Sequence, residues 1–385
     1  MDIDAGKLLG FGCMRMPHFN SDPTDIDYPK LNALIDEFMS RGFSYFDTAY
    51  TYHNYQAEKI VRLALVDRYP RESFQLATKL PLRDFKDAAD MRRIFAEQLT
   101  NCGVDHFDYY LLHNMGSNVY GKCEQHDAFG FLDEVRSSGK ATFVGMSFHD
   151  TPKLLATILD KHAEQLDFLQ LQVNYVDWEQ PAVESEECLR LARRYGKPVI
   201  VMEPCKGGTL VNLPDQARSI LKEADPQAST ASWALRFAAS QPGVIRVLSG
   251  MNEMEQVLDN CATFQSFRPI AKDELEAVWK ARDIIEAQTA IACTACEYCA
   301  HTCPKQIPIS KYFSLYNSNK RTTGYFSSQF VYYNNIVQAG SGKASDCIKC
   351  GVCEKACPQH LPIRELLSQV AEAFEQQAPP LKVTK

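Results

Sequence analysis

Positive charge is not in excess in this sequence. Lys and Arg number 41 against 48 Asp and Glu, which leaves a formal net charge of −7 at pH 7. A protein that binds nucleic acid or an anionic membrane surface needs a basic patch, because it must neutralise phosphates. We therefore expect no nucleic acid and no membrane among its partners.

Long apolar runs are scarce too. No uninterrupted stretch reaches the roughly 20 apolar residues that a membrane-spanning helix needs. The N-terminal letters MDIDAGKLLGFG are acidic where a signal peptide is basic, and they contain no apolar core segment. The apolar fraction of 45% is nevertheless enough for a large buried core. These features predict a soluble cytoplasmic protein.

The glycine-rich fingerprint of a dinucleotide-binding open sheet is missing. Gly10-Phe11-Gly12 is only a lone Gly-x-Gly, whereas a doubly wound sheet usually carries G-x-G-x-x-G after its first strand. Strand-like runs instead alternate with amphipathic helical stretches, several of which end on Gly. The expected strands are 7–14, 44–48, 74–79, 107–113, 142–147, 168–174, 198–203 and 244–249.

Eight strand–helix units in about 260 residues are typical of a (β/α)8 TIM barrel. We therefore predict an α/β fold in which a barrel domain at 1–270 is followed by a linker helix at 271–290. A smaller, mainly α-helical, ferredoxin-like domain would occupy residues 291–385. The doubly wound open sheet is the alternative architecture for the first part.

Eight of the fourteen cysteines fall in two tight groups after residue 290. Each group has the spacing Cys-x2-Cys-x2-Cys-x3-Cys-Pro, which is the bacterial ferredoxin run. In that run three thiolates hold one [4Fe–4S] cluster and the fourth reaches the other cluster, so ligation is crossed between the groups. The predicted ligands are Cys293, Cys296, Cys299 and Cys357 for one cluster, and Cys347, Cys350, Cys353 and Cys303 for the other.

Structural zinc is the alternative for these cysteines. Zinc sites usually pair two Cys-x2-Cys units across a spacer and need no third and fourth Cys in each group. The spacing therefore favours iron–sulfur clusters. Crossed ligation would also tie the two halves of the tail together, so that metal binding becomes part of its folding.

The spacer between the two cysteine groups, about residues 310–345, is rich in aromatic side chains. Aromatics beside Lys320 and Arg321 could form a base-stacking platform. We favour an apolar cover that packs on the clusters or against the barrel. The aromatics are Tyr312, Phe313, Tyr316, Tyr325, Phe326, Phe330, Tyr332 and Tyr333.

The motif FDTAYTY at 46–52 follows the second expected strand and has the form Asp-Thr-Ala-x-x-Tyr. With this motif the first part of the chain, roughly residues 5–265, resembles the aldo/keto reductase family, which carries it after strand two. The segments ATK at 77–79 and LLHN at 111–114 match the positions at the ends of strands three and four. The resemblance implies a catalytic tetrad of Asp47, Tyr52, Lys79 and His113.

The chemistry of these four side chains suits a carbonyl reductase. Three of them stand at expected carboxyl ends of strands, the face at which barrel enzymes build active sites. A carbonyl that accepts hydride needs a proton, and Tyr52 donates one readily at neutral pH only if the Lys79 ammonium lowers its pKa. Asp47 would keep Lys79 charged, and a neutral His113 would orient and polarise the carbonyl. Any one of these residues alone is more often a cap or a solvated side chain.

Contacts for a nicotinamide cofactor, NAD(P)H, follow from the same resemblance. The aromatic residue that stacks on the nicotinamide ring in the family is replaced here by Met202, which leaves room for a flavin. The implied cofactor-binding residues are Ser147, Gln172 and Asn174 at the amide group, Met202 at the ring, and Ser249, Gly250 and Asn260 at the phosphate and adenine end.

The choice between NAD and NADP depends on the residues near a 2′-phosphate. Gln256 stands where the family often has a basic residue, with Glu253 and Glu255 close by. Carboxylates repel a phosphate, so we predict no strong preference for NADP over NAD. Lys206 or Arg246 would change this prediction if either side chain faced the site.

The two halves together predict an oxidoreductase. A nicotinamide delivers two electrons as hydride, whereas a [4Fe–4S] cluster passes one at a time. Three interpretations stay open. In the first, the chain reduces a carbonyl (or oxidises an alcohol), and its clusters serve structure or a redox partner protein. In the second, the clusters exchange electrons with the barrel through a bound flavin. In the third, the chain is an electron-transfer or scaffold protein with an inactive barrel. The complete tetrad favours an enzyme with a small-molecule carbonyl substrate.

Overall fold

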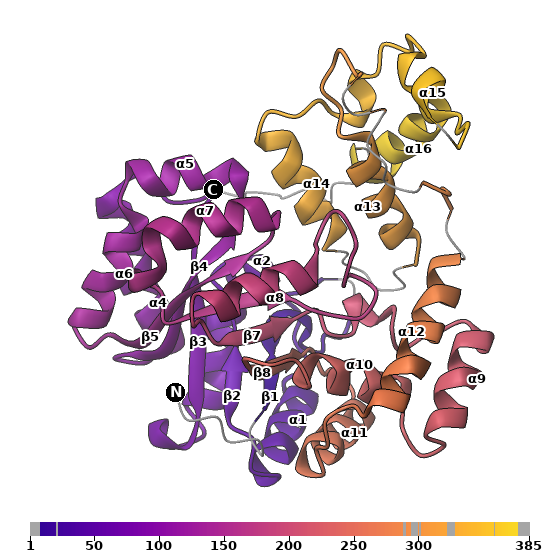
Figure 1. Cartoon of the computed structure of the whole chain (residues 1–385). Helices are drawn as coiled ribbons and strands as arrows, with labels where there is room; N and C mark the ends of the chain where they lie inside the picture. Colours follow the sequence, from indigo (N-terminus) through magenta and orange to yellow (C-terminus); the bar gives the residue numbers. More distant parts are fainter. Residues whose placement is uncertain are drawn as a thin grey trace.

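The computed structural model describes residues 8–20, 22–287, 290–293, 299, 302–321, 328–357 and 359–375. Its first part is a closed barrel in which eight parallel strands pair in the order of the chain (Figure 1). This closure confirms the predicted barrel and rules out the open sheet. The strands are β1 Leu9–Gly12, β2 Tyr45–Asp47, β3 Gln75–Pro81, β4 Phe107–Met115, β5 Ala141–Phe148, β6 Phe168–Gln172, β7 Val199–Met202 and β8 Val244–Ser249.

Strand register brings the ends of neighbouring strands to one face. Asp47, the last residue of β2, pairs with Ala77 of β3, and Lys79 of β3 pairs with Leu111 of β4. Two residues further along, Pro81 pairs with His113. All strands run in the same direction, so residues far apart in the chain meet at the carboxyl end of the barrel.

Helices surround the strands, and their ends follow local sequence signals. Asp87 caps α4 (Ala88–Cys102) by accepting from the Asp90 amide, and Gly103 ends that helix in the left-handed region at φ 68°. The other helices of the barrel part are α1 Tyr28–Ser40, α2 Tyr52–Tyr55, α3 Ala57–Val61, α5 Ser117–Gln125, α6 Ala128–Ser137, α7 Pro152–His162, α8 Ser185–Arg194, α9 Asp215–Ala224, α10 Thr230–Ala239, α11 Met254–Gln265 and α12 Lys272–Ala287.

Helix α12, which covers most of the expected linker, packs along the outside of the barrel. Its Val278, Ala281 and Ile285 are buried in one hydrophobic cluster with Trp233 of α10 and Leu221 of α9. The chain therefore leaves the barrel only after this helix.

The described residues from 290 to 375, called the C-terminal module below, are helical. They contain α13 Ile309–Arg321, α14 Gln329–Gln338, α15 Val352–Ala356 and α16 Ile363–Glu375. Spacer aromatics form the centre of this module. The rings of Tyr312 and Tyr333 lie 4.5 Å apart, and Tyr333 stacks on Phe374 of α16 at 4.9 Å. Because these rings are buried, they pack the module and offer no platform for bases; Tyr325 and Phe326 lie outside the described residues.

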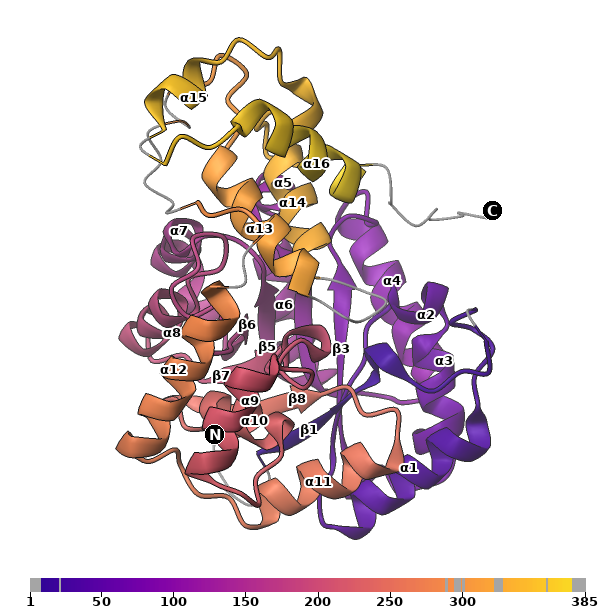
Figure 2. The same ribbon diagram turned by 90° about the vertical axis from the view of Figure 1, so that its right-hand side faces the viewer.

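The C-terminal module sits on the carboxyl face of the barrel (Figures 1 and 2). Helices α13 and α14 face the barrel loops, and α15 and α16 lie farther out. The Ser314 hydroxyl donates to Gln180 Oε1 at 2.8 Å, and Ala182 and Val183 join the hydrophobic cluster of the module. The loops that carry a barrel active site are therefore in contact with the module.

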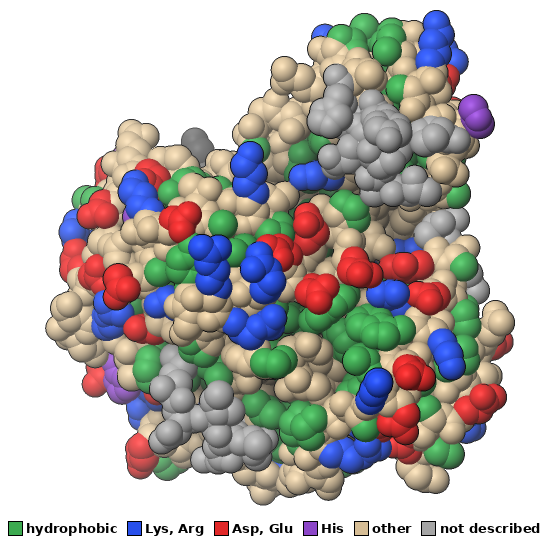
Figure 3. Space-filling model, in the orientation of Figure 1, with side chains coloured by type: hydrophobic (Ala, Val, Ile, Leu, Met, Phe, Trp, Pro, Cys, Tyr) green, Lys and Arg blue, Asp and Glu red, His purple; other side chains and the backbone are tan. Residues whose placement is uncertain are grey.

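Charged side chains of both signs are interspersed over the face of the barrel seen in Figure 3. Within the described residues, no helix combines the length and the apolar character needed to cross a membrane.

Candidate active site

Lys79 is the centre of a buried polar group at the carboxyl face of the barrel. Its side chain is fully buried, and Nζ donates to Asp47 Oδ1 at 2.5 Å and to the Thr48 carbonyl oxygen at 2.7 Å. The second oxygen of Asp47 accepts from Gln170 Nε2 at 2.9 Å. Both charges are therefore paired and hydrogen-bonded, as a buried ion pair requires.

Tyr52 and His113 complete the predicted set of four. The Tyr52 hydroxyl lies 3.5 Å from Lys79 Nζ, and the ammonium is 5.0 Å from the centre of the Tyr52 ring. The imidazole of His113 meets that ring edge to face, with 5.5 Å between centroids. The structure thus brings together all four residues that the sequence placed on separate strands and loops.

Burial and the Lys79 charge set the protonation states of this group. Burial raises the pKa of Tyr52, and the opposing effect of Lys79 offsets only part of that rise. The expected lowering by Lys79 is present, but burial outweighs it, so the net pKa is raised. Burial alone would lower the pKa of Lys79, but the Asp47 carboxylate and the Tyr52 oxygen outweigh it and the pKa is raised.

His113 has the opposite behaviour. Burial first, and then the positive charge of Lys79, hold the pKa of its imidazole well below 6.5. At neutral pH the group therefore has a protonated phenol, an ammonium and a neutral imidazole around one point. Such a set can donate a proton to an oxygen and hydrogen-bond it at the same time.

His53 holds the loop that carries Tyr52, and sequence reasoning missed it. Its Nε2 accepts from the Met16 amide at 3.4 Å, and its Nδ1 lies 2.6 Å from the carbonyl oxygen of Pro23. His53 and Asn54 both have φ near 50°, so the backbone turns sharply just after Tyr52. A His directly after a predicted catalytic Tyr was the available signal.

The predicted amide contacts form a second buried group. The Ser147 hydroxyl accepts from the Asn114 amide at 2.8 Å. The side-chain amides of Gln172 and Asn174 both donate to Asp177 Oδ2 at 2.7 Å. Asp177 was not expected from the sequence, and its carboxylate orders the side chains of Gln172 and Asn174.

One acceptor of this group has no protein partner. Gln172 Oε1 is buried and unsatisfied within the described residues, although buried polar atoms are nearly always hydrogen-bonded. The carboxamide N–H2 of a nicotinamide is a donor that such an oxygen can accept. The residues present therefore fit the amide end of that cofactor.

At the expected ring and phosphate positions, Met202 is half-buried and presents no aromatic face. Asn260 Nδ2 donates to Ser249 Oγ at 3.0 Å, and a Cβ added to Gly250 would touch the Arg15 side chain at 3.5 Å. Arg15 was not among the predicted residues; it forms an ion pair with Glu203 at 3.3 Å. The signal that was overlooked is its position just after β1.

Neither of the two cations considered for a 2′-phosphate is free to bind one. Lys206 is buried in an ion pair with Asp177, and burial lowers its pKa. Arg246 is buried near the opposite end of the barrel, where Nη2 lies 3.4 Å from Gln75 Oε1 at the start of β3. Its guanidinium also lies 5.9 Å from the Tyr45 ring centre, which accounts for an arginine inside β8.

The N-terminus of α11 uses the residues expected near the 2′-phosphate as helix caps. Glu253 and Gln256 form a reciprocal capping box. Lys30, a cation beside this helix end, is paired with Glu253 at 2.6 Å.

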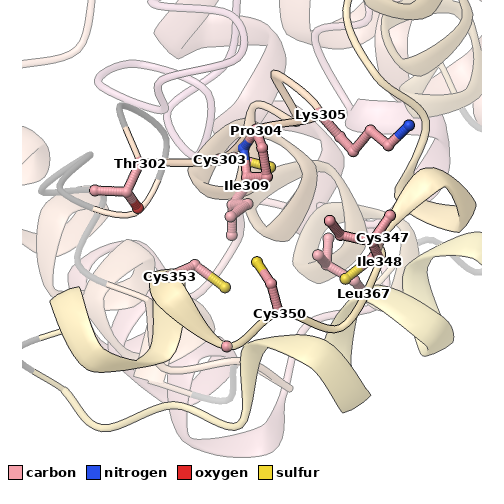
Figure 4. A pocket seen from close by; sticks show the side chains of 11 residues that line it. Thr302, Cys303, Pro304, Lys305, Ile309, Cys347, Ile348, Cys350, Cys353 and Leu367 are labelled. Atoms are coloured by element: carbon pink, nitrogen blue, oxygen red, sulfur yellow. The ribbon is translucent and has the colours of Figure 1, made fainter.

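In the C-terminal module, four predicted ligands line one pocket (Figure 4). Cys303 from the first cysteine group lies with Cys347, Cys350 and Cys353 from the second around about 320 Å³ of empty space, including its opening to solvent. Cys350 and Cys353 direct their sulfur atoms into this space. The four thiolates of a [4Fe–4S] cluster surround the cluster, so they must be spread around a space large enough to hold it. These four residues therefore fit such a cluster in the crossed arrangement.

The other set is described in part. Cys299 and Cys357 are buried in the module core and Cys293 packs against it, while Cys296 lies outside the described residues. Burial, followed by the charges of Cys293, Cys353 and Cys357, raises the pKa of Cys299 to about 11. Cys299 therefore lies near cysteines of both groups.

The barrel and the module each match a known sequence family. Residues 8–283 match the aldo/keto reductase family, and residues 292–361 match the 4Fe-4S dicluster domain. The chain belongs to the aldo/keto reductase family. It combines that reductase barrel with an iron–sulfur domain in one polypeptide.

Known aldo/keto reductases share the barrel at low identity. The uncharacterised oxidoreductase YqkF of Bacillus subtilis is 22% identical over 308 residues, which cover 72% of this chain and 92% of that protein. An aldo-keto reductase from Klebsiella pneumoniae in complex with NADPH superposes with a TM-score of 0.56 and 20% identity, over 71% of this chain and 90% of its own. The holo form of AKR11C1 from Bacillus halodurans has a TM-score of 0.58 and 22% identity, over 71% and 91%.

Proposed function

We propose that this aldo/keto reductase uses a nicotinamide dinucleotide to reduce a small-molecule carbonyl, or to oxidise the matching alcohol. The observation that carries the proposal is the contact of Lys79 with both Asp47 and Tyr52, beside a neutral His113. Nothing in that group has to move before it can donate a proton.

Each side chain has a distinct part in this reaction. The nicotinamide supplies the hydride when it is bound. The Tyr52 hydroxyl donates its proton to the carbonyl oxygen, and Lys79 stabilises the negative charge that this leaves on the phenol oxygen. Neutral His113 hydrogen-bonds the carbonyl and orients it, while Asp47 keeps Lys79 charged and in place.

The cofactor assignment rests on the amide group. The buried, unpartnered Gln172 Oε1 and the nearby Ser147 hydroxyl suit a nicotinamide carboxamide. The NADPH bound to the Klebsiella pneumoniae protein favours the same class of cofactor. The flavin that the sequence left open has no support among these relatives, and we do not propose it.

For the C-terminal module we propose two [4Fe–4S] clusters that exchange single electrons with a redox partner protein. The support is the ring of four cysteines around one pocket, in which Cys350 is exposed. Exposure of a ligand shortens the path between a cluster and a docked partner.

Replacing Tyr52 with Phe tests the reductase proposal. A general acid contributes about 10²–10⁴-fold to a rate, so kcat should fall by that factor with a carbonyl that the wild type reduces. Binding of the nicotinamide, followed by fluorescence titration, should change little because the hydroxyl is not a cofactor contact.

Tyr55→Phe is a matched control on the same short helix. The Tyr55 hydroxyl reaches Asp84 at 3.2 Å on the surface and is remote from Lys79. This variant should keep wild-type turnover. A Tyr52→Phe enzyme within a few-fold of wild type would refute the assignment of the acid.

A further inference from the structure

One side chain of the C-terminal module is buried against the mouth of the barrel. Asn335 of α14 is 1% exposed. Its Nδ2 donates to Asn114 Oδ1 and to the His149 carbonyl oxygen, both at 3.2 Å, and its Oδ1 accepts from Arg83 Nη2 at 2.6 Å. A single amide is thus bonded to the loop after β3, to the carboxyl end of β4 and to the residue that follows β5.

Two of the three bonded positions lie next to a residue of the proposed site. Asn114 directly follows His113, and His149 comes two residues after Ser147. Asn114 has φ of 60°, in the left-handed region, and its backbone amide donates to Ser147 Oγ at 2.8 Å. Asn is one of the few non-glycine residues that adopt this region readily, and Asn335 bonds its side chain here.

The fit around Asn335 is tight. A Cβ added to Gly116 would stand 3.0 Å from Asn335 Nδ2, so glycine at that position lets α14 approach the loop. One turn earlier on the same face of the helix, the ring of Tyr332 lies 5.7 Å from the His149 ring. The contact between α14 and the barrel is therefore closely packed and formed by specific side chains.

We propose that Asn335 is a positioning residue of the reductase site, supplied by the iron–sulfur module. It holds Asn114 at the end of β4 and His149 just after β5 so that His113 and Ser147 face the carbonyl and the nicotinamide. The barrel of this chain is therefore complete only with the module seated on it. This inference rests on the proposed reductase function, and it assigns the module a part in that reaction apart from electron transfer.

The test replaces Asn335 with Ala in the full, cluster-loaded protein. We expect kcat/KM for the carbonyl to fall about tenfold, because His113 and Ser147 lose their outer support. The iron content, the visible absorbance of the clusters and the affinity for the nicotinamide should stay within about twofold of wild type.

Gln338→Ala is the matched control. Gln338 is on the same helix and accepts from Asn118 Nδ2 at 2.9 Å, a module–barrel hydrogen bond of similar length at the exposed rim. Its loss should leave kcat/KM within about twofold. Equal activities of the two variants would overturn the proposal, as would a loss of clusters in Asn335→Ala that accounts for the lost activity.

Hydrogen exchange provides a test that needs no turnover. Amides around Asn114 and His149 should exchange faster in Asn335→Ala than in Gln338→Ala, and unchanged exchange would also overturn the proposal. If the reductase assignment is wrong, the Tyr52→Phe variant will stay active. That outcome is independent of the Asn335 variants.

Discussion

In the barrel, Lys79 contacts Asp47, Thr48 and Tyr52 directly. In the C-terminal module, four cysteines instead face one another across an open space of about 320 Å³. The polar group of the barrel is organised by hydrogen bonds that the chain makes with itself. The cysteines have no such bonds to one another, and a bound cluster has to join them.

The two sites therefore differ in the interactions that stabilise them. A barrel whose charges are already paired needs no cofactor to be stable, and the cofactor adds only to its function. A small module whose ligands surround a cavity gains folding free energy from what fills it. The same chain therefore combines a preformed site with one that we expect to depend on its metal.

Removal of the clusters should reveal the largest difference in stability between the barrel and the C-terminal module. Anaerobically prepared protein should be brown and contain about eight iron atoms per chain. Chelation should unfold the C-terminal module and leave the barrel helices folded, as measured by hydrogen exchange of the two parts. Zinc in place of iron, or a barrel that unfolds together with the module, would contradict the distinction.

Single cysteine variants test the crossed ligation. Cys303→Ala should disturb the cluster held by Cys347, Cys350 and Cys353, because these four residues line one pocket. The electron paramagnetic resonance of the reduced protein should lose one of two cluster signals. Cys261→Ala, at a buried barrel cysteine, is the control that should keep both.

Breaking the barrel's ion pair is expected to have the next largest effect. Lys79→Met leaves Asp47 buried without a cation, which should cost about 3–5 kcal/mol of stability and abolish carbonyl reduction. Urea unfolding of the barrel measures this. Arg92→Ala, which removes a solvent-exposed pair with Glu134, should change the stability far less. A Lys79→Met barrel as stable as that control would show that the preformed group does not contribute to stability.

The difference in affinity between NADH and NADPH should be a smaller effect. Lys206 and Arg246 are engaged elsewhere, and Lys30 is paired with Glu253, so NADH and NADPH should bind within about tenfold of each other. Gln256→Arg should shift the ratio toward NADPH, because arginine binds phosphate bidentately. A wild-type preference for NADPH of about a hundredfold, or 2.7 kcal/mol, would reveal a phosphate clamp not recognised here.

The pH dependence should be the smallest effect. The pKa of Tyr52 is raised above its ordinary value of 10, so the acid loses its proton only as the pH rises beyond that value. The pKa of His113 lies well below 6.5, so the imidazole stays neutral until the pH falls far below neutrality. The kcat/KM for carbonyl reduction should thus be flat from about pH 6 to pH 9. A step near pH 7 would mean that another group controls the reaction.

Local signals in the sequence were enough to predict several elements and residues. Strand β8 was expected at 244–249 and is Val244–Ser249. Cysteine spacing predicted that Cys303 would join the second group, and the structure places it there. Asp47, Lys79 and His113 could be named because their motifs resemble those of the aldo/keto reductase family, and strand ends in a parallel barrel meet at one face. In each case the information lies within a few residues along the chain.

Other features were decided by the tertiary structure alone. Asn335 and Asn114 are 221 positions apart, and nothing near either of them signals that they are in contact. The position of Arg246 at the far end of the barrel likewise depends on which strands come together. The net pKa of Tyr52 also required the fold, because the Lys79 charge was visible in the sequence and the depth of burial was not. The spacing of residues in the sequence determines which chemical groups are available. Burial and long-range contacts in the fold determine the surroundings of those groups.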